Sequence, residues 1–267
     1  MHSNFRAVDP VQPAAGYIGG KRNLAARLIA RIETMPHDAY AEAFVGMGGV
    51  FLRRRSAPRS ETINDISGDV ATFFRVLQRH YTHFLEMLRF QIASRREFER
   101  LVATDPDTLT DLERAARFLY LQRLAFGGKV AGRNFGVSTT QGARFNVAKL
   151  APTLEAIHER LTGVVIERLP WQEFLRRYDR PGMLFYLDPP YFGVENDYGR
   201  DCFARVEFAE LADRLRSLKG AFLLSINDRP EVRSLFEGFA MEAVATTYSI
   251  DRGKPSKAGE LIIAKPD

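Results

Sequence analysis

The 267-residue sequence has few of the residues that mark several common protein classes. It contains a single cysteine, Cys202, which excludes an intrachain disulfide framework and a cysteine-rich zinc site. Its five histidines are scattered, so no cluster of metal ligands is visible. The longest apolar runs, such as AFLLSI and ELIIA, have the length of a strand and are too short for a membrane span. The first sixteen residues lack the apolar segment of a signal peptide. We therefore expect a cytoplasmic protein that binds neither a metal nor a membrane.

Acidic residues are missing from one long stretch of an otherwise mixed chain. Between Glu113 and Glu155 every charged side chain is basic: Arg114, Arg117, Arg123, Lys129, Arg133, Arg144 and Lys149. The net charge of +5 is alone a weak sign of an anionic partner. A stretch of one sign repels itself unless a polyanion faces it, although a solvated basic face is the alternative. The pattern favours contact with nucleic acid.

The apolar periodicity predicts an α/β protein with an insertion. The apolar spacing predicts helices over 21–34 and 69–80. Short strands are expected at AYAEAFVG and RSETINDISG, and a turn followed by a helix is expected at GGVFLRRRS. The pattern turns helical after residue 80 and then becomes rich in glycine, threonine and asparagine, as in a hairpin or extended loop. Strand–helix alternation resumes afterwards. The sequence therefore predicts a catalytic domain made of 1–80 and 148–267, interrupted by an inserted domain at 81–147.

A glycine motif, FVGMGG, follows the first predicted strand. Glycines there allow a tight turn and a close approach of a ligand to the backbone. Asp65 ends the next strand about twenty residues after Gly46, where a carboxylate can accept hydrogen bonds from ribose hydroxyls. Val50 and Phe51 stand where a dinucleotide motif needs its third glycine, and no GxxxxGK[ST] motif follows a strand. An adenosine compound without pyrophosphate, such as S-adenosylmethionine, fits this pattern. A tight turn beside a helix-capping aspartate is the alternative.

The stretch LDPPY ends another predicted strand, MLFYL. Pro189 and Pro190 cannot donate ladder hydrogen bonds, so the strand must stop there. Asp188 then stands at the carboxyl end of a central strand, where open α/β sheets bind their ligands. A carboxylate and a backbone carbonyl that accept both hydrogens of an aromatic amine would localise its lone pair toward a methyl donor. The ring of Tyr191 offers a face on which a base can stack. A solvent-facing turn after a core strand is the alternative.

Five segments in order, YIGGK, EAFVGMGGVFL, INDISGDV, LDPPY and GELIIAKP, resemble the Dam-type DNA adenine methyltransferases. The resemblance covers most of the chain. It implies a Rossmann-like S-adenosylmethionine-dependent methyltransferase fold with an inserted helical and hairpin DNA-recognition domain. It also implies site-specific transfer of a methyl group from S-adenosylmethionine to the exocyclic N6 amine of adenine in double-stranded DNA, after the base is flipped out of the duplex.

The resemblance also assigns residues to roles. The expected catalytic residues are Asp188, Pro189, Pro190 and Tyr191. The expected cofactor-binding residues are Tyr17, Lys21, Phe44, Gly46, Gly48, Asp65 and Asp188. Candidates for DNA contact, taken from the basic stretch, are Arg123, Lys129, Arg133, Asn134 and Arg144. The family's arginine–asparagine–glycine core is replaced here by GRNFG, so the recognised DNA sequence stays open.

Several expectations concern the remainder of the chain. The polar segment 192–203 beside LDPPY is expected to be a mobile loop that orders over DNA or the flipped base, with Cys202 a passive member. A monomer is expected, because one subunit contains all the named parts. Two alternatives are an RNA or other-base amine methyltransferase of the same fold and an inactive DNA-binding protein. A dinucleotide oxidoreductase would leave the basic stretch and DPPY unexplained. The biological role, in restriction, phage modification or epigenetic marking, stays open.

Overall fold

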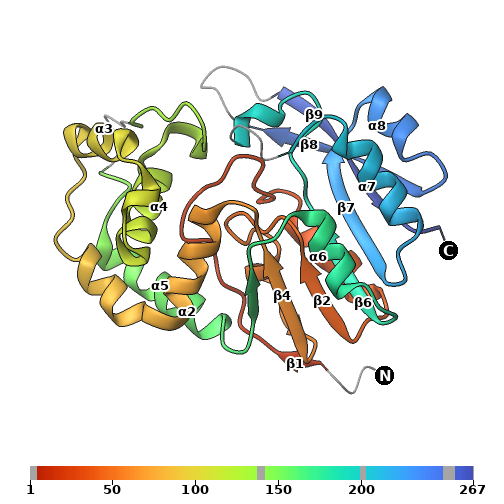
Figure 1. Cartoon of the computed structure of the whole chain (residues 1–267), viewed down its shortest axis with the longest axis horizontal. Coiled ribbons are helices and arrows are strands. Elements are labelled where there is room, and N and C mark those ends of the chain that lie inside the picture. The colour runs from red at the N-terminus through yellow and green to blue at the C-terminus, as the bar shows by residue number, and fades with distance from the viewer. Residues whose placement is uncertain (1–4, 137–141, 199–202, 249–255, 267) are drawn as a thin grey trace.

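The computed structural model describes residues 5–136, 142–198, 203–248 and 256–266 (Figure 1). Within these ranges seven strands form one sheet in the order β5-β4-β2-β6-β7-β9-β8. Its strands are β2 (Ala39–Glu42), β4 (Ser60–Asn64), β5 (Val165–Glu167), β6 (Met183–Leu187), β7 (Ala221–Asn227), β8 (Ala240–Tyr248) and β9 (Ser256–Ala264). The first five strands of this order run parallel, whereas β9 is antiparallel to both β7 and β8. The expected α/β, Rossmann-like fold is thus confirmed.

Alternating side chains of the central strand β6 show how the sheet is covered. Leu184 and Tyr186 join the hydrophobic cluster that contains α1 (Ala25–Thr34) and α2 (Gly68–Leu88). The intervening residues Met183, Phe185 and Leu187 join a second cluster on the opposite face. That second cluster contains side chains of α6 (Trp171–Tyr178), α7 (Glu207–Arg216) and α8 (Pro230–Leu235). The period of two along a strand therefore produces three layers, with buried helices on both faces.

The order of the strands fixes where a ligand can bind. From β2 the chain moves outward to β4 and β5, and then returns to the other side of β2 to form β6 and β7. The direction of winding therefore reverses between the neighbouring strands β2 and β6. In open α/β sheets, ligands bind outside the carboxyl ends of the strands at such a switch point. The ends of β2 and β6, Glu42 and Leu187, face this position.

The helical segment expected as an insertion shares the main core. It contains α3 (Arg95–Ala103), α4 (Asp111–Leu124) and part of α2, and it leads into α5 (Val147–Arg160). Figure 1 shows these helices grouped at the left, away from β7, β8 and β9. Buried side chains of α4 belong to the same cluster as those of α2. The expected boundary after residue 80 coincides with a kink at His80, but α2 continues beyond it. The division into two domains stays a prediction.

The glycine-rich part of this segment contains little regular structure where it is described. A 3₁₀ turn, η3, covers Phe126–Gly128, and an isolated bridge joins Ala125 to Phe135. This arrangement resembles the expected extended loop more than a hairpin. Residues 137–141 lie outside the described ranges. The second short 3₁₀ turn of the insertion, η2 (Pro106–Thr108), connects α3 to α4.

Two expected helices differ from those observed. The prediction of a helix after the glycine motif is wrong. The chain forms only a 3₁₀ turn there, η1 (Phe51–Arg53), and the next residues form β3 (Ser56–Ala57), which pairs with β1 (Arg6–Ala7). The reason is Arg54, whose backbone is extended and whose buried guanidinium lies 3.7 Å from the ring centre of Tyr40. The helix expected over 21–34 begins only at Ala25.

Arg54 belongs to a buried charged cluster that ties the sheet to α5. Glu61 on β4 accepts a 2.9 Å hydrogen bond from Nη1 of Arg54. The same carboxylate accepts bonds of 2.7 and 2.8 Å from the two Nη atoms of Arg160. All three side chains are buried. Removing one member of a buried ion pair leaves an uncompensated charge and costs about 3–5 kcal/mol.

We therefore expect Glu61→Gln to lower the free energy of unfolding by about 3–5 kcal/mol, because two buried guanidinium groups lose their carboxylate. Urea unfolding followed by circular dichroism would measure the change. Glu242→Gln is the matched control, because Glu242 pairs with Arg27 at the surface and such pairs contribute about 0–1 kcal/mol. Equal losses in the two variants would contradict the expectation.

Candidate active site

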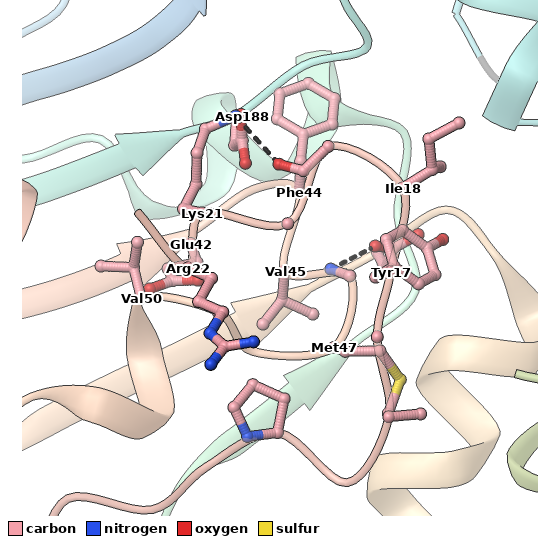
Figure 2. A pocket seen from close by; sticks show the side chains of 18 of the residues that line it. Tyr17, Ile18, Lys21, Arg22, Glu42, Phe44, Val45, Met47, Val50 and Asp188 are labelled. Atoms are coloured by element: carbon pink, nitrogen blue, oxygen red, sulfur yellow. Dashed lines mark hydrogen bonds and ion pairs between the residues drawn. The ribbon is translucent and has the colours of Figure 1, made fainter. Parts of the chain in front are cut away.

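A cavity of about 440 Å³ lies at the switch point between β2 and β6 (Figure 2). Figure 2 shows Lys21 and Asp188 together on one side of this cavity and Tyr17 on another. Its lining includes these residues expected to bind the cofactor: Tyr17, Lys21, Phe44, Gly46, Asp65 and Asp188. Gly48 stands behind the loop instead, with a φ of 75°, and a Cβ there would lie 2.8 Å from the side chain of Leu52. Gly48 therefore permits the turn, whereas its neighbours face the cavity.

Asp65 holds the glycine loop in shape. Its two carboxylate oxygens accept 2.9 Å hydrogen bonds from the backbone N–H groups of Gly46 and Ser67. Gly46 has a φ of 52°, and a Cβ there would lie 3.1 Å from the ring of Tyr17. Burial raises the pKa of Asp65 to about 6, while the two backbone donors oppose that rise. The carboxylate thus braces the turn and also lines the cavity.

Lys21 and Asp188 form the charged centre of the site. Nζ of Lys21 lies 2.7 Å from Oδ1 of Asp188, and it also donates to the carbonyl of Gly19 at 3.1 Å. The Lys21 side chain is 2% exposed, whereas that of Asp188 is 19% exposed and opens onto the cavity. The hydroxyl of Ser225 donates to the same Oδ1 at 3.3 Å. Burial raises the pKa of Asp188 to about 6, and the positive charge of Lys21 limits the rise.

A second carboxyl group, that of Glu42, lines the cavity at the end of β2. It is 1% exposed and accepts a 2.7 Å hydrogen bond from the hydroxyl of Tyr40. Burial raises its pKa to about 8, and the neighbouring charge of Asp188 adds to this rise. Glu42 is therefore mostly protonated at neutral pH. It can donate a hydrogen bond into the cavity where an ionised carboxylate could only accept one.

The turn after β6 is held from β7 and β9. The side chain of Asn227, at the end of β7, accepts from the N–H of Phe192 and donates to its carbonyl, both at 2.9 Å. The hydroxyl of Tyr191 accepts a 2.9 Å hydrogen bond from Lys21 and donates to the carboxylate of Glu260 on β9. Pro190 lines the cavity. The turn that the sequence predicted to be catalytic is thus held in place beside the glycine loop by these hydrogen bonds.

The five candidates for DNA contact fall into two groups. Arg123 donates to the carbonyls of Ala14 and Arg144 at 3.2 and 3.0 Å, and it also lines the cavity. Arg133 donates to the carbonyl of Lys129 at 3.2 Å and to Gln122 at 3.3 Å. Burial lowers the pKa of both arginines. The side chains of the remaining candidates are exposed: Lys129, Asn134 and Arg144.

Segment 192–203, expected to be mobile, is described only in part. A 3₁₀ turn, η4 (Glu195–Tyr198), follows the Asp-Pro-Pro-Tyr turn, and residues 199–202, with Cys202, lie outside the described ranges. Its mobility stays a prediction. Among the residues that are described, no three His, Cys, Asp or Glu side chains gather where they could hold a metal ion. Nor does any described helix have the length and apolar character needed to cross a membrane.

The family model for D12 class N6 adenine-specific DNA methyltransferases matches residues 17–250. The chain belongs to this family. The type II methyltransferase M1.LlaDCHI of Lactococcus lactis subsp. cremoris is 24% identical over 94% of this chain and 93% of its own. The type II methyltransferase M.CviBI of Paramecium bursaria Chlorella virus NC1A is 20% identical over 86% of this chain and 88% of its own.

A third relative, the DNA N-6-adenine-methyltransferase of Escherichia phage P1, is 28% identical over 78% of this chain but 29% of its own length. Among solved structures, a precorrin 8W decarboxylase from Methanobacterium thermoautotrophicum aligns over 91% of this chain and 89% of its own. That alignment has a TM-score of 0.39 and 11% identity. The family assignment does not depend on this distant likeness.

Membership of the D12 class confirms the main functional expectation from the sequence. The protein is a DNA adenine-N6 methyltransferase, and its membership of this class implies that S-adenosylmethionine is the methyl donor. The narrower resemblance to the Dam type, and the role of each residue in the cavity, stay predictions.

Sequence reasoning missed several residues of this candidate site. Glu42 stands two positions before the glycine motif, and an acidic residue so close to that motif is the one local signal that could have identified it. Ser225, Asn227 and Glu260 lie in strands whose sequences read as ordinary core. Their part in the site arises because β7 and β9 pair beside β6.

The cavity leads to a prediction about pH. The turnover rate should increase as the pH rises through about 6, where Asp188 ionises, provided that both substrates are saturating. Lys21→Met removes the cation that lowers the pKa of Asp188, so the acid limb of the kcat profile should move to higher pH. Arg31→Met, an exposed change on α1, is the matched control and should leave the limb in place. An acid limb in Lys21→Met that is unmoved or lies at lower pH would count against the assignment.

Proposed function

We propose that this chain is a Dam-type enzyme that methylates an adenine flipped out of double-stranded DNA. The observation that carries the proposal is the carboxylate of Asp188, which opens onto the cavity from a rigid Asp-Pro-Pro-Tyr turn beside the glycine loop. The carboxylate, the neighbouring aromatic ring and the adjoining cavity supply the parts that amine methylation needs. The order of the glycine loop, the basic segment and the turn along the chain supports the Dam type.

The cavity fits an adenosine-bearing methyl donor. Its volume of about 440 Å³ lies within the usual range for small-molecule sites, roughly 300–1,000 Å³. Tyr17, Phe44 and Asp65 would hold the adenosine part, because they offer aromatic faces and a carboxylate for ribose hydroxyls. For a carboxylate-bearing end, protonated Glu42 offers a hydrogen-bond donor and Lys21 offers its positive charge. When bound, S-adenosylmethionine supplies a methyl group activated by a sulfonium.

Asp188 would act on the amine of the target base. The lone pair of an exocyclic amine is delocalised into its ring, so the amine is a weak nucleophile. Oδ1 of Asp188 already binds Lys21 and Ser225, so we assign Oδ2 to a hydrogen of the amine. A backbone carbonyl fixed by the two prolines would accept the other hydrogen. These acceptors are set in place when the protein folds, so little reorganisation is needed during the reaction.

The target base must leave its duplex to reach this turn. Unstacking and unpairing a base cost a few kcal/mol, and stacking on an aromatic ring offsets about 1–3 kcal/mol of that cost. Tyr191 is suited to this role because Lys21 and Glu260 bind its hydroxyl and so restrain its ring. The base would then lie between the ring and the carboxylate.

Asp188→Ala should lower kcat for methyl transfer by about 100- to 1,000-fold, because an aligned polar partner of the amine is lost. Tritiated S-adenosylmethionine and unmethylated DNA would provide the assay, with chromatography to identify the labelled base. Asp213→Ala, an exposed change on α7, is the matched control. Full activity of Asp188→Ala, or label outside N6-methyladenine in the wild type, would refute the proposal. Label on RNA but not on DNA would favour the RNA alternative.

A further prediction separates two exposed basic residues from the half-buried Arg133. Lys129→Ala and Arg144→Ala should weaken DNA binding and each reduce the slope of log K against log salt by about 0.9, because each removes one phosphate contact. Arg133→Ala should instead lower the melting temperature, because its guanidinium holds Lys129 and Gln122. Fluorescence anisotropy with a labelled duplex and thermal unfolding would measure the two effects. Unchanged salt slopes for both exposed variants would exclude these contacts.

A further inference from the structure

Strands β7 and β9 place two polar side chains against the catalytic turn. In their antiparallel register Asn227 is opposite Glu260. Asn227 binds the main chain of Phe192 on both its N–H and its carbonyl, and Glu260 accepts the hydroxyl proton of Tyr191. One residue pair of the ladder therefore fixes both the backbone and the ring of the turn.

Glu260 is an unusual residue for this position. Its side chain is 0% exposed, although a carboxylate loses several kcal/mol of hydration when it is buried. An apolar residue of similar size would fill the same place without this loss of hydration free energy. The methyl-transfer chemistry assigned to Asp188 gives Glu260 no direct contact with the base. Its charge therefore needs another explanation.

The explanation lies in the charge balance around Lys21. Its ammonium is 2.7 Å from Oδ1 of Asp188 and 3.9 Å from Oε2 of Glu260. Glu42, with a pKa raised to about 8, is mostly neutral at pH 7. The ammonium thus faces the carboxyl groups of Asp188 and Glu260. When Oδ2 of Asp188 accepts the amine of a base, charge is drawn away from Oδ1, and Glu260 still helps to balance the buried cation.

We propose that Glu260 is a positioning residue for methyl transfer, which holds the ring of Tyr191 and keeps the ammonium of Lys21 paired while Asp188 receives the target amine. This inference rests on the proposed function of Asp188. Glu260 acts through its two neighbours and does not touch the base.

Two substitutions separate the charge of Glu260 from its hydrogen bond. Glu260→Gln keeps an acceptor for Tyr191 but removes the charge. Asp188 then becomes the main counterion of Lys21, so its carboxylate is held more tightly and ionises at lower pH. We expect the acid limb of kcat to move to lower pH and its plateau to fall by about tenfold. Glu260→Leu also loses the bond to Tyr191, and its plateau should fall by about 100-fold.

The titration of Asp188 depends on the titratable groups near it. Among the described residues, these are Lys21 before α1, Glu42 and Tyr40 on β2, Tyr186 on β6 and Glu260 on β9. Both tyrosine hydroxyls stay protonated, because burial raises their pKa well above the ordinary value. Lys21 and Glu260 are therefore the groups whose charge decides the ionisation of Asp188 between mildly acidic and neutral pH.

The test uses the full chain and compares the wild type with Glu260→Gln and Glu260→Leu. Glu242→Gln, on the neighbouring strand β8, is the matched control. Kinetics with saturating S-adenosylmethionine and DNA would give the acid limb and the plateau. Carboxyl ¹³C chemical shifts, assigned with Asp188→Asn, would follow the ionisation of Asp188 without turnover. Calorimetric titration should show S-adenosylmethionine affinities for Glu260→Gln and the wild type that agree within about threefold, because Glu260 does not line the cavity.

A lower acid limb, a lower carboxyl pKa and a reduced plateau in Glu260→Gln, with none of these in Glu242→Gln, would support the proposal. An active wild type with an unchanged profile in Glu260→Gln would overturn it and leave the proposed function intact. A plateau that falls only in proportion to the folded fraction, with an unmoved limb, would also overturn it. Failure of the wild type to label adenine would refute the proposed function, and this inference with it. Glu260→Gln keeps the test decisive if Glu260→Leu fails to fold.

Discussion

The buried ammonium of Lys21 is the interaction on which the geometry of the site depends. It binds Asp188 at 2.7 Å, the hydroxyl of Tyr191 at 2.9 Å and the carbonyl of Gly19 at 3.1 Å. These contacts join the N-terminal loop to the turn after β6, and Glu260 extends the cluster to β9. If the loop moved away from the sheet, the carboxylate of Asp188 would lose its cation, which is strongly unfavourable for a buried charge. The loop that carries Tyr17 is therefore held over the glycine turn by electrostatics.

The basic segment holds the same loop from its other side. The buried amide of Gln122 donates to the carbonyls of Gly16 and Gly128, at 3.0 and 2.6 Å. The N–H of Ile18 donates to Gly128 at 3.1 Å, and a Cβ on Gly128 would lie 3.0 Å from the backbone of Gly16. No side chain larger than hydrogen fits between the two loops at this point. A displacement of the basic segment by DNA would therefore act directly on the loop that carries Tyr17.

The sequence predicted the parts of the site that follow a strand and missed those that arrive from a distance. Asp65 and Asp188 were predictable because parallel strands end at one edge, so two motifs far apart in the chain meet there. Glu260 was not, because it begins the apolar run ELIIA and gains its role only through the pairing of β9 with β7. Counting charges likewise made Arg123 a candidate for DNA contact but could not show its bonds to backbone carbonyls. The prediction of a helix after the glycine motif was wrong for a similar reason, because Arg54 binds the carboxylate of Glu61 on β4.

The carboxyl groups of the cavity destabilise the folded chain. Burial raises the pKa of Asp65 and Asp188 to about 6 and that of Glu42 to about 8, from 3.8 and 4.5. The folded chain thus binds more protons than the unfolded chain between these values. The contribution of Asp65 and Asp188 to stability therefore falls as the pH rises from about 4 to about 6, and that of Glu42 falls up to about pH 8. Two hydrophobic clusters, one on each face of the sheet, offset this cost. In return, the carboxyl groups stand largely out of bulk solvent, so each interacts more strongly with a hydrogen-bond donor that enters the cavity.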